Sequence, residues 1–360
     1  MPSRPKLPEI DLVRAIAIIA VVLIHSTSGA TQLSLGSGSQ AVFFMLNKAS
    51  LFTVPLFIWI SGVVLFYTYY DRWEPGMSRV FWTKRLRRIL IPYVLCSLFY
   101  YLYNQFMFHG NIQFDVIYFI KLLISGNASY HLYYMVIIVQ FYLLFPLLIT
   151  AVRRSAWLRQ WLIPLGIGVQ AAAYAFHHEV HPLPEYASLF VSYSALFAFG
   201  AFMGIHYTAI VAWSERYKQL IWTIMCLAGA TFVGMLLLHQ YGLTAIGNVW
   251  FELALLVYCM SMPLCCVRWS QARLASRSKL GSSLSALGAA SFGIYLVHPA
   301  LLTLWDRSVP PSGRIWIYDL HTVASILISL LGSWLCIQLY AFTRTHWMLK
   351  SKELSKFKSA

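Results

Sequence analysis

Long runs of apolar residues, separated by short polar and basic segments, recur along the whole chain. Each run is close to or above the roughly 20 residues that an α-helix needs to cross the hydrocarbon core of a bilayer. The pattern therefore predicts an all-α, polytopic membrane protein with about ten transmembrane helices. The predicted spans are residues 10–29, 43–70, 86–108, 130–151, 157–176, 186–206, 217–239, 246–267, 284–305 and 317–343.

One further apolar segment, residues 112–126, is too short to span and contains Lys121. We expect it to form an interfacial or re-entrant piece. No internal repeat and no Gly/Ser-rich linker divides the chain. We therefore expect one transmembrane domain over residues 1–360, with no soluble extracytoplasmic domain.

Composition supports a lipid environment. Hydrophobic residues make up 59% of the 360 residues and charged residues 11%, with a mean hydropathy of +0.65. Ordinary soluble domains carry roughly 25% charged residues. A cell membrane, crossed several times, is the expected location, and the lipid bilayer is the first expected partner.

The net charge of +15 does not form one patch, which argues against nucleic acid as a partner. Instead, 22 of the 27 Lys and Arg residues fall in alternate connecting segments and at the two termini. The positive-inside rule then places both termini in the cytoplasm. Residues 1–30 also resemble a signal peptide, but Asp11 and Arg14 lie too close to its apolar centre, so we expect this segment to be retained.

The first predicted span carries Asp11, Arg14 and His25. Ionisable groups at mid-membrane cost roughly 2.5–3.5 kcal/mol each, so they tend to line cavities or pair. Arg14 and His25 lie about 16 Å apart along the helix axis and within about 20° of one face. Polar side chains on one face of the helix predict a polar cavity along the span. The alternative is that Arg14 reaches the inner headgroups and His25 bonds a neighbouring helix.

Other polar residues are expected in the outer half of the membrane, of which His298 lies at a depth similar to that of His25 and the others lie at or near outer helix ends. They are His131, His239, Glu252 and His298. Interfacial wetting remains the alternative for the first two, and a structural hydrogen bond for Glu252. No local ligand spacing supports a metal site from these residues or from the six cysteines, so no metal is predicted.

The basic cluster at residues 84–88 opens the third predicted span. Arg side chains offer paired donors that suit an anionic, phosphate-bearing ligand. Anchoring at the cytoplasmic surface by contact with anionic lipid explains the same cluster.

Five motifs in order resemble the membrane-bound acyltransferase-3 family. They are residues 9–17 followed by His25, residues 54–62, residues 84–93, residues 131–134 with 141–146, and residues 291–299. The resemblance is closest to the stand-alone O-acetyltransferase form of the branch that acts on exopolysaccharide or other surface glycans.

That resemblance implies transfer of an acyl group, commonly acetyl, from cytoplasmic acyl-CoA to a hydroxyl of a surface or exported glycan. It implies ten spans and functional roles for Arg14, His25, Arg85 and Arg88. Acyl-CoA (acetyl-CoA) is expected as a co-substrate, with no permanently bound cofactor. Glycan-synthesis machinery is an expected partner.

A mechanism consistent with these residues has CoA phosphates at Arg14, Arg85 and Arg88, and His25 as general base. Glu252 or His298 would orient His25 or stabilise developing charge, with Asp11, Ser61 and His131 in support. An acyl-enzyme on Ser26 or Ser61 remains open, although Ser61 next to Gly62 also suits close helix packing. The competing function is a transporter or flippase of a glycan or lipid-linked saccharide.

Overall fold

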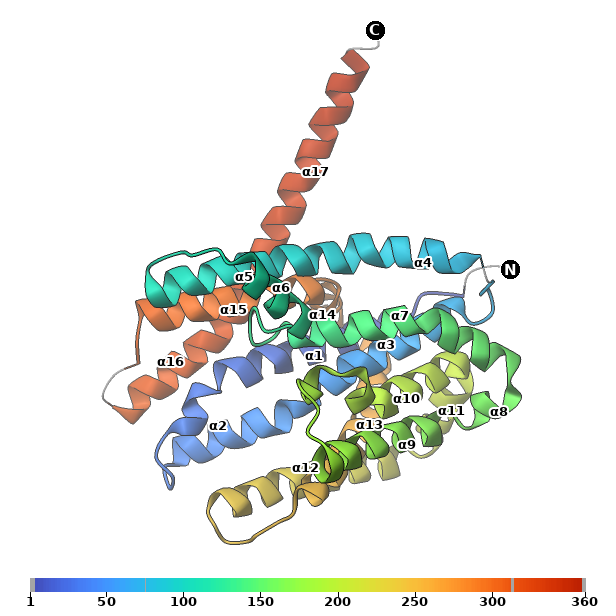
Figure 1. Cartoon of the computed structure of the whole chain (residues 1–360), viewed down its shortest axis with the longest axis horizontal. Helices are drawn as coiled ribbons and strands as arrows, with labels where there is room; N and C mark the ends of the chain where they lie inside the picture. Colours follow the sequence, from blue (N-terminus) through green and yellow to red (C-terminus); the bar gives the residue numbers. More distant parts are fainter. Residues whose placement is uncertain (1–3, 75, 312–313, 358–360) are drawn as a thin grey trace.

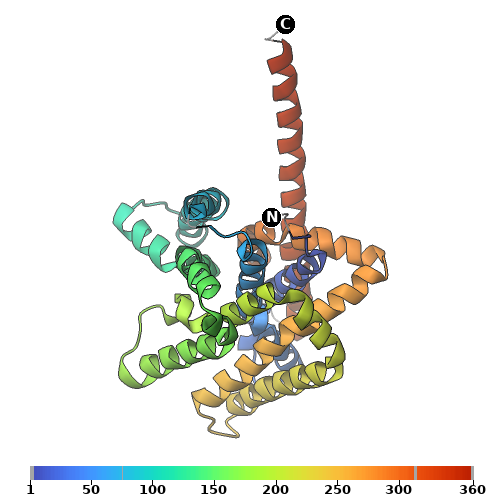
Figure 2. The ribbon, with the colours of Figure 1, turned by 90° about the vertical axis from the view of Figure 1, so that its right-hand side faces the viewer.

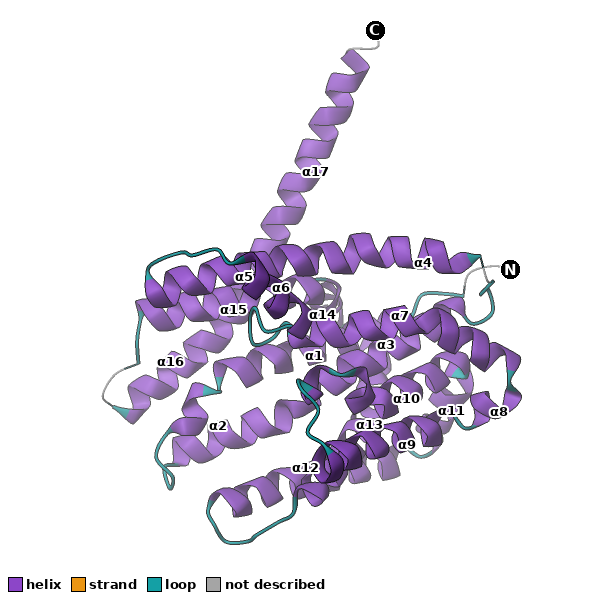
Figure 3. Cartoon of the chain, in the orientation of Figure 1, coloured by secondary structure: helices purple, strands orange, loops and turns teal. Residues whose placement is uncertain are grey.

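The structure is a computed structural model that describes residues 4–74, 76–311 and 314–357, with side chains as far as residue 346. All regular structure in these ranges is helical (Figure 3). The α-helices are α1 (Pro8–Ser26), α2 (Gly38–Ala49), α3 (Thr53–Tyr69), α4 (Met77–Arg85), α5 (Ile91–His109), α6 (Val116–Ser125), α7 (Tyr133–Arg154), α8 (Ala156–Gln160), α9 (Leu162–Ala175), α10 (Ser194–Ile205), α11 (Tyr207–Arg216), α12 (Lys218–Gln240), α13 (Asn248–Ala275), α14 (Lys279–Ala289), α15 (Ser291–Ser308), α16 (Ile315–Leu327) and α17 (Ser333–Phe357). Short π-helical segments are η3 (Leu86–Leu90), η4 (Phe176–Val180) and η7 (Ile328–Gly332), and short 3-10 segments are η1 (Gly29–Gln32), η2 (Ser50–Phe52), η5 (Tyr186–Ser188) and η6 (Phe190–Tyr193).

The prediction of an all-helical, multi-pass membrane protein is confirmed. In the described residues, seven helices are long and apolar enough to span a bilayer, or up to nine if two bent helix pairs each count as one span. One pair, α10 with α11, bends by 102°, and the other, α14 with α15, bends by 74°. Ten spans and two cytoplasmic termini therefore remain predictions.

Of the ten predicted spans, the fifth, residues 157–176, has no counterpart among the candidate spans of the described residues. That stretch is divided between α8, with 5 residues, and α9, with 14 residues. At about 1.5 Å per residue, α9 alone covers roughly 21 Å of a hydrocarbon core about 30 Å thick. It continues into η4, which contains His177, His178 and Glu179 and is therefore polar.

Helix α1 lies between two apolar cores and contributes to both. Ile10, Val13, Ala17 and Ala20 pack into one core with residues of α3, α7, α10 and α13. The neighbouring positions 18, 21 and 22 pack into the other core with residues of α5, α7 and α15. The spacing of three and four residues within each set gives α1 two apolar faces, which fixes the rotation of its polar side chains.

Glycines allow two close helix crossings beside α1. A Cβ at Gly62 of α3 would lie 2.5 Å from the Phe197 carbonyl oxygen of α10, and a Cβ at Gly200 of α10 would collide with the Trp59 carbonyl of α3. A Cβ at Gly288 of α14 would likewise collide with the Asp11 carbonyl of α1. Small residues at helix interfaces let membrane helices pack backbone to backbone, as expected for the Ser61-Gly62 pair.

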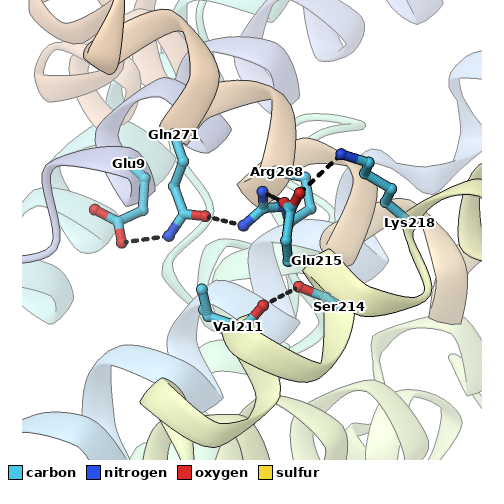
Figure 4. A network of polar contacts seen from close by, with 7 residues as sticks. All are labelled: Glu9, Val211, Ser214, Glu215, Lys218, Arg268 and Gln271. Carbon is cyan, nitrogen blue, oxygen red and sulfur yellow. Dashed lines mark hydrogen bonds and ion pairs between the residues drawn. The ribbon is translucent and has the colours of Figure 1, made fainter.

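A polar network holds the first turn of α1 (Figure 4). The Glu9 carboxylate accepts a hydrogen bond of 2.6 Å from the Tyr207 hydroxyl and one of 3.4 Å from the Gln271 amide. Gln271 in turn accepts a hydrogen bond of 2.9 Å from Arg268, which is ion-paired with Glu215 (Figure 4). The start of α1 is thus connected through side chains to α11 and α13.

Two helices lie at the edge of the bundle. The predicted segment 112–126 contains the short apolar helix α6, capped by the Asp115 carboxylate and ended by Gly126 at a φ of 80°. Helix α17 extends away from the other helices in both views (Figures 1 and 2). Neither helix borders the cavities described next.

Candidate functional site

The guanidinium of Arg14 faces a cavity of about 280 Å³, which we call the basic cavity. Arg14 is ion-paired with Asp11 at 2.7 Å, one helical turn earlier on α1. The cavity is also lined by Arg85, by Ser61 of α3, and by residues at the α14–α15 bend. Ser61 donates its hydroxyl to the Phe57 carbonyl at 3.0 Å. Two arginine side chains thus line the basic cavity.

The Arg85 side chain is held by aromatic rings. Its guanidinium carbon lies 5.3 Å from the centre of the Phe81 ring and 4.8 Å from that of Tyr142. Its buried Nε has no hydrogen-bond partner. Arg88, three residues later in η3, is exposed and does not line the basic cavity. The structure therefore brings Arg85 to Arg14 but leaves Arg88 on the surface.

His25, near the other end of α1, lines two cavities. One, the central cavity, has a volume of about 180 Å³ and also includes His131, Tyr134 and Tyr295 in its wall. The other, the distal cavity, has a volume of about 550 Å³ and lies against α15 and α16. The imidazole is partly exposed and makes ring contacts with Tyr130 and His298, at centroid distances of 4.7 and 5.4 Å.

His298 is fully buried beside His25. Its Nδ1 lies 3.1 Å from the Ile294 carbonyl oxygen on the same helix. Because a carbonyl only accepts, this contact assigns the proton to Nδ1 and leaves a lone pair on Nε2. That Nε2 is buried without a partner. His298 can therefore accept a proton or a hydrogen bond but is closed to bulk water.

His131 is 1% exposed, so interfacial wetting does not describe it. Its ring centre lies 5.6 Å from that of His298, and its carbonyl accepts a hydrogen bond from the Tyr295 hydroxyl. His239, by contrast, is exposed on α12, as expected for an interfacial residue. The structure thus brings together His25, His131 and His298, as their predicted depths suggested.

The three cavities follow one another along α1. The basic and central cavities share Tyr134 and Tyr295 in their walls, and the central and distal cavities share His25. The rings of Tyr134 and Tyr295 lie 5.6 Å apart and mark the boundary between the basic and central cavities. Along α1 the structure thus has a row of three cavities, of which the central one is lined mostly by apolar surface; a continuous polar cavity along this helix stays a prediction.

Glu252 lies elsewhere. It lines a largely apolar cavity of about 380 Å³ between α9, α10 and α13, together with Gln170 and Tyr174. No contact joins it to the imidazole of His25 among the described residues. Its predicted role as a partner of His25 therefore has no support in the geometry.

Several residues of the site were not singled out from the sequence. Tyr134 and Tyr295 occur within the quoted motifs without an assigned role. Asp306 and His321 line the distal cavity, with 3.5 Å between carboxylate and imidazole. His321 lies inside the last predicted span, so the rule that selected His25 applied to it equally. In the described residues, no three His, Cys, Asp or Glu side chains are placed to hold a metal ion.

Comparison with known proteins gives a family and a set of relatives. Residues 7–338 match the sequence model of the acyltransferase-3 family, described as an acyltransferase domain. The chain is 25% identical over 316 residues to a Staphylococcus aureus (strain MRSA252) protein named "Probable poly-beta-1,6-N-acetyl-D-glucosamine export protein", covering 82% of each chain. The protein of the same name from strain MSSA476 is 24% identical over the same shares. No solved structure matches the chain.

Proposed function

Because the chain belongs to the acyltransferase-3 family, we propose that it transfers an acyl group, in the first instance acetyl, from cytoplasmic acyl-CoA to a hydroxyl of a cell-surface or exported glycan. The observation that carries the proposal is the row of three cavities along α1. It joins two cationic side chains near one end of the helix to an accessible imidazole near the other.

The basic cavity suits the donor. CoA carries several phosphate charges, and guanidinium groups form strong paired hydrogen bonds with phosphate oxygens. Arg14 and Arg85 line one cavity and can supply such donors. The acyl-pantetheine arm then extends past Tyr134 toward His25, over the axial distance of about 16 Å that separates Arg14 and His25 on a helix.

The chemistry at His25 is a direct acyl transfer. The acceptor hydroxyl oxygen attacks the thioester carbonyl carbon, forming a C–O bond, while His25 removes the hydroxyl proton. The C–S bond then breaks, and the leaving thiolate takes the proton from His25, giving the acyl ester and free CoA. His298 supports this cycle as a positioning residue that keeps the His25 ring in place.

The test is acyl transfer by purified protein in lipid nanodiscs, with labelled acetyl-CoA and oligosaccharides of β-1,6-linked N-acetylglucosamine as acceptor. We expect the wild type to form acetylated oligosaccharide and His25→Ala to lose transfer while still binding acetyl-CoA. His239→Ala, an exposed histidine of α12, is the matched control and should behave as wild type. No transfer by the wild type, or full transfer by His25→Ala, would refute the proposal.

A second function is favoured by one specific observation, the export role in the names of the relatives. In that case the chain would move a glycan across the bilayer rather than modify it. The two functions separate in closed proteoliposomes without acyl-CoA. Entry of labelled oligosaccharide under these conditions would support export, whereas no entry, with acetylation once acetyl-CoA is supplied, supports acyl transfer.

A further inference from the structure

We propose that the distal cavity binds the acceptor as a neutral sugar unit, and that Asp306 and His321 hold the hydroxyl groups of that unit. This inference rests on the proposed acyl transfer and specifies its acceptor side. The cavity volume of about 550 Å³ is within the roughly 300–1,000 Å³ of small-molecule sites. His25 forms part of its wall, so a bound hydroxyl can reach the proposed base.

The lining of the distal cavity is rich in hydroxyl and other hydrogen-bonding groups. Besides His25, they include Tyr130, Thr303, Asp306, Tyr318 and His321. A sugar hydroxyl both donates and accepts; the carboxylate can accept from it, and the imidazole and phenol groups can donate to it. Three further hydroxyls, those of Ser28, Thr322 and Ser325, donate their protons to backbone carbonyls and can only accept from a ligand. The aromatic side chains of the lining provide flat apolar surface for the ring carbons.

Asp306 and His321 are arranged as an open pair. The His321 Nε2 and the Asp306 carboxylate oxygen lie 3.5 Å apart, beyond the usual 2.7–3.2 Å or so of a direct N–H···O hydrogen bond. His321 Nε2 is buried and has no hydrogen-bond partner. A ligand hydroxyl can bridge the two groups, donating to the carboxylate and accepting from the imidazole.

The orientation of His321 is set by stacking. The Trp305 ring lies 5.5 Å from the His321 ring with 22° between their planes. Such stacking fixes the imidazole plane before a ligand arrives, which lowers the entropic cost of binding. The His321 side chain is nine-tenths buried, yet its Nε2 has no hydrogen-bond partner. Buried polar atoms are normally hydrogen-bonded, so this nitrogen indicates a polar ligand in the distal cavity.

Charge argues for a neutral acceptor. The basic cavity contains two arginines, whereas no Lys or Arg is among the described residues that line the distal cavity. The nearest basic residue on α15, Arg307, is turned away, with its guanidinium 4.4 Å from the Phe108 ring centre. A carboxylate without a cation disfavours an anionic ligand such as a sugar phosphate. Donor and acceptor are thus separated by the charge of their cavities.

The test measures KM for each substrate in the nanodisc assay described above, with acetyl-CoA and β-1,6-linked N-acetylglucosamine oligosaccharides. Asp306→Asn and His321→Gln should each raise the acceptor KM by about tenfold or more, because each removes a hydrogen bond to a charged or polar partner. KM for acetyl-CoA should not change, which also shows that the variants are folded.

Asp319→Asn is the matched control. Asp319 is on the same helix as His321, accepts a hydrogen bond of 2.8 Å from Ser39, and does not line the distal cavity. Its acceptor KM should equal that of the wild type. If both Asp306→Asn and His321→Gln kept the wild-type acceptor KM, the proposed acceptor site would be refuted, whereas the proposed acyl transfer would stand. Absence of transfer by the wild-type protein would instead refute the proposed function.

Discussion

The imidazole rings of His25 and His298 lie 5.4 Å apart between centroids, with 29° between their planes, although they belong to the first and the fifteenth α-helix. Only the first is accessible from the cavities, and the second is fully buried. The pair thus consists of one partly exposed imidazole and one buried imidazole whose Nδ1 proton is donated to a backbone carbonyl. This arrangement assigns different roles to the two rings.

Replacement of His298 by Phe should keep the ring contact but remove the buried nitrogen lone pair. We expect kcat for acyl transfer to fall by about 10- to 100-fold, less than the roughly 100- to 10,000-fold expected for loss of a general base at His25. KM for acetyl-CoA should not change, since the donor phosphates bind elsewhere. An unchanged kcat would exclude His298 from positioning His25.

Arg85→Gln should weaken acetyl-CoA binding by about 10- to 100-fold, the loss of one charge-assisted hydrogen-bond set. Arg87→Gln is the control, because Arg87 is an exposed member of the same basic cluster. Isothermal titration in nanodiscs measures both. Equal, small effects at positions 85 and 87 would indicate that the basic cluster only contacts anionic lipid. If Arg88→Gln weakened binding as much as Arg85→Gln, both arginines would bind CoA, although only Arg85 lines the basic cavity.

Tyr134→Ala should enlarge the passage between the basic and central cavities, because Tyr134 is in the wall of both. Longer acyl chains should then compete better with acetyl. We expect the ratio of butyryl to acetyl transfer to rise by about tenfold, the scale on which apolar pockets discriminate by size. Mass spectrometry of products from mixed donors measures the ratio. An unchanged ratio with normal acetyl transfer would contradict this route.

Gly200→Ala should destabilise the protein by about 1–3 kcal/mol, because the new Cβ has no room beside the Trp59 carbonyl. Gly234→Ala in α12 is the matched control, since nothing lies within 4 Å of a Cβ there. That control should be neutral or stabilising by about 0.5–1 kcal/mol. Unfolding in mild detergent compares the two, and equal stabilities would disprove the close α3–α10 crossing.

Tags at both termini should react only after the cytoplasmic face is opened, as the distribution of basic residues predicts. Labelling of intact cells and of inverted membrane vesicles with an impermeant reagent measures this. Tags that react from opposite sides of the membrane would exclude an even number of spans.

The sequence predicted the fold class and the depth of the polar residues but not which helices are neighbours. Hydrophobic run length indicates where a helix crosses, and the position of a residue in the run indicates its depth. His25, His131 and His298 were all expected in the outer half of the membrane, and the His298 ring is in contact with the other two. Glu252 was expected in the same half but lies in a separate cavity, because helix order around the bundle is set by packing of side chains that no single-sequence pattern records.

The rotation of side chains about each helix was only partly predictable. Arg14 and His25 were expected on one face of α1, and each lines cavities of the same row. Arg85 and Arg88 belong to one motif, yet only Arg85 lines the basic cavity. The intervening π-helical η3 departs from the 3.6-residue period on which such estimates rest, and the sequence carries no clear signal for it. His321, an ionisable residue inside the predicted span 317–343, could have been identified as a candidate site residue by the same reasoning as His25.

The network that holds Glu9 has a consequence for biogenesis. Its two hydrogen-bond donors, Tyr207 and Gln271, are 198 and 262 positions further along the chain. A ribosome must therefore synthesise most of the protein before the opening carboxylate of α1 finds its partners. A nascent chain that ends before α11 lacks both partners of Glu9, and one that ends before α13 still lacks Gln271, so the helix that carries Arg14 and His25 gains these contacts late in synthesis.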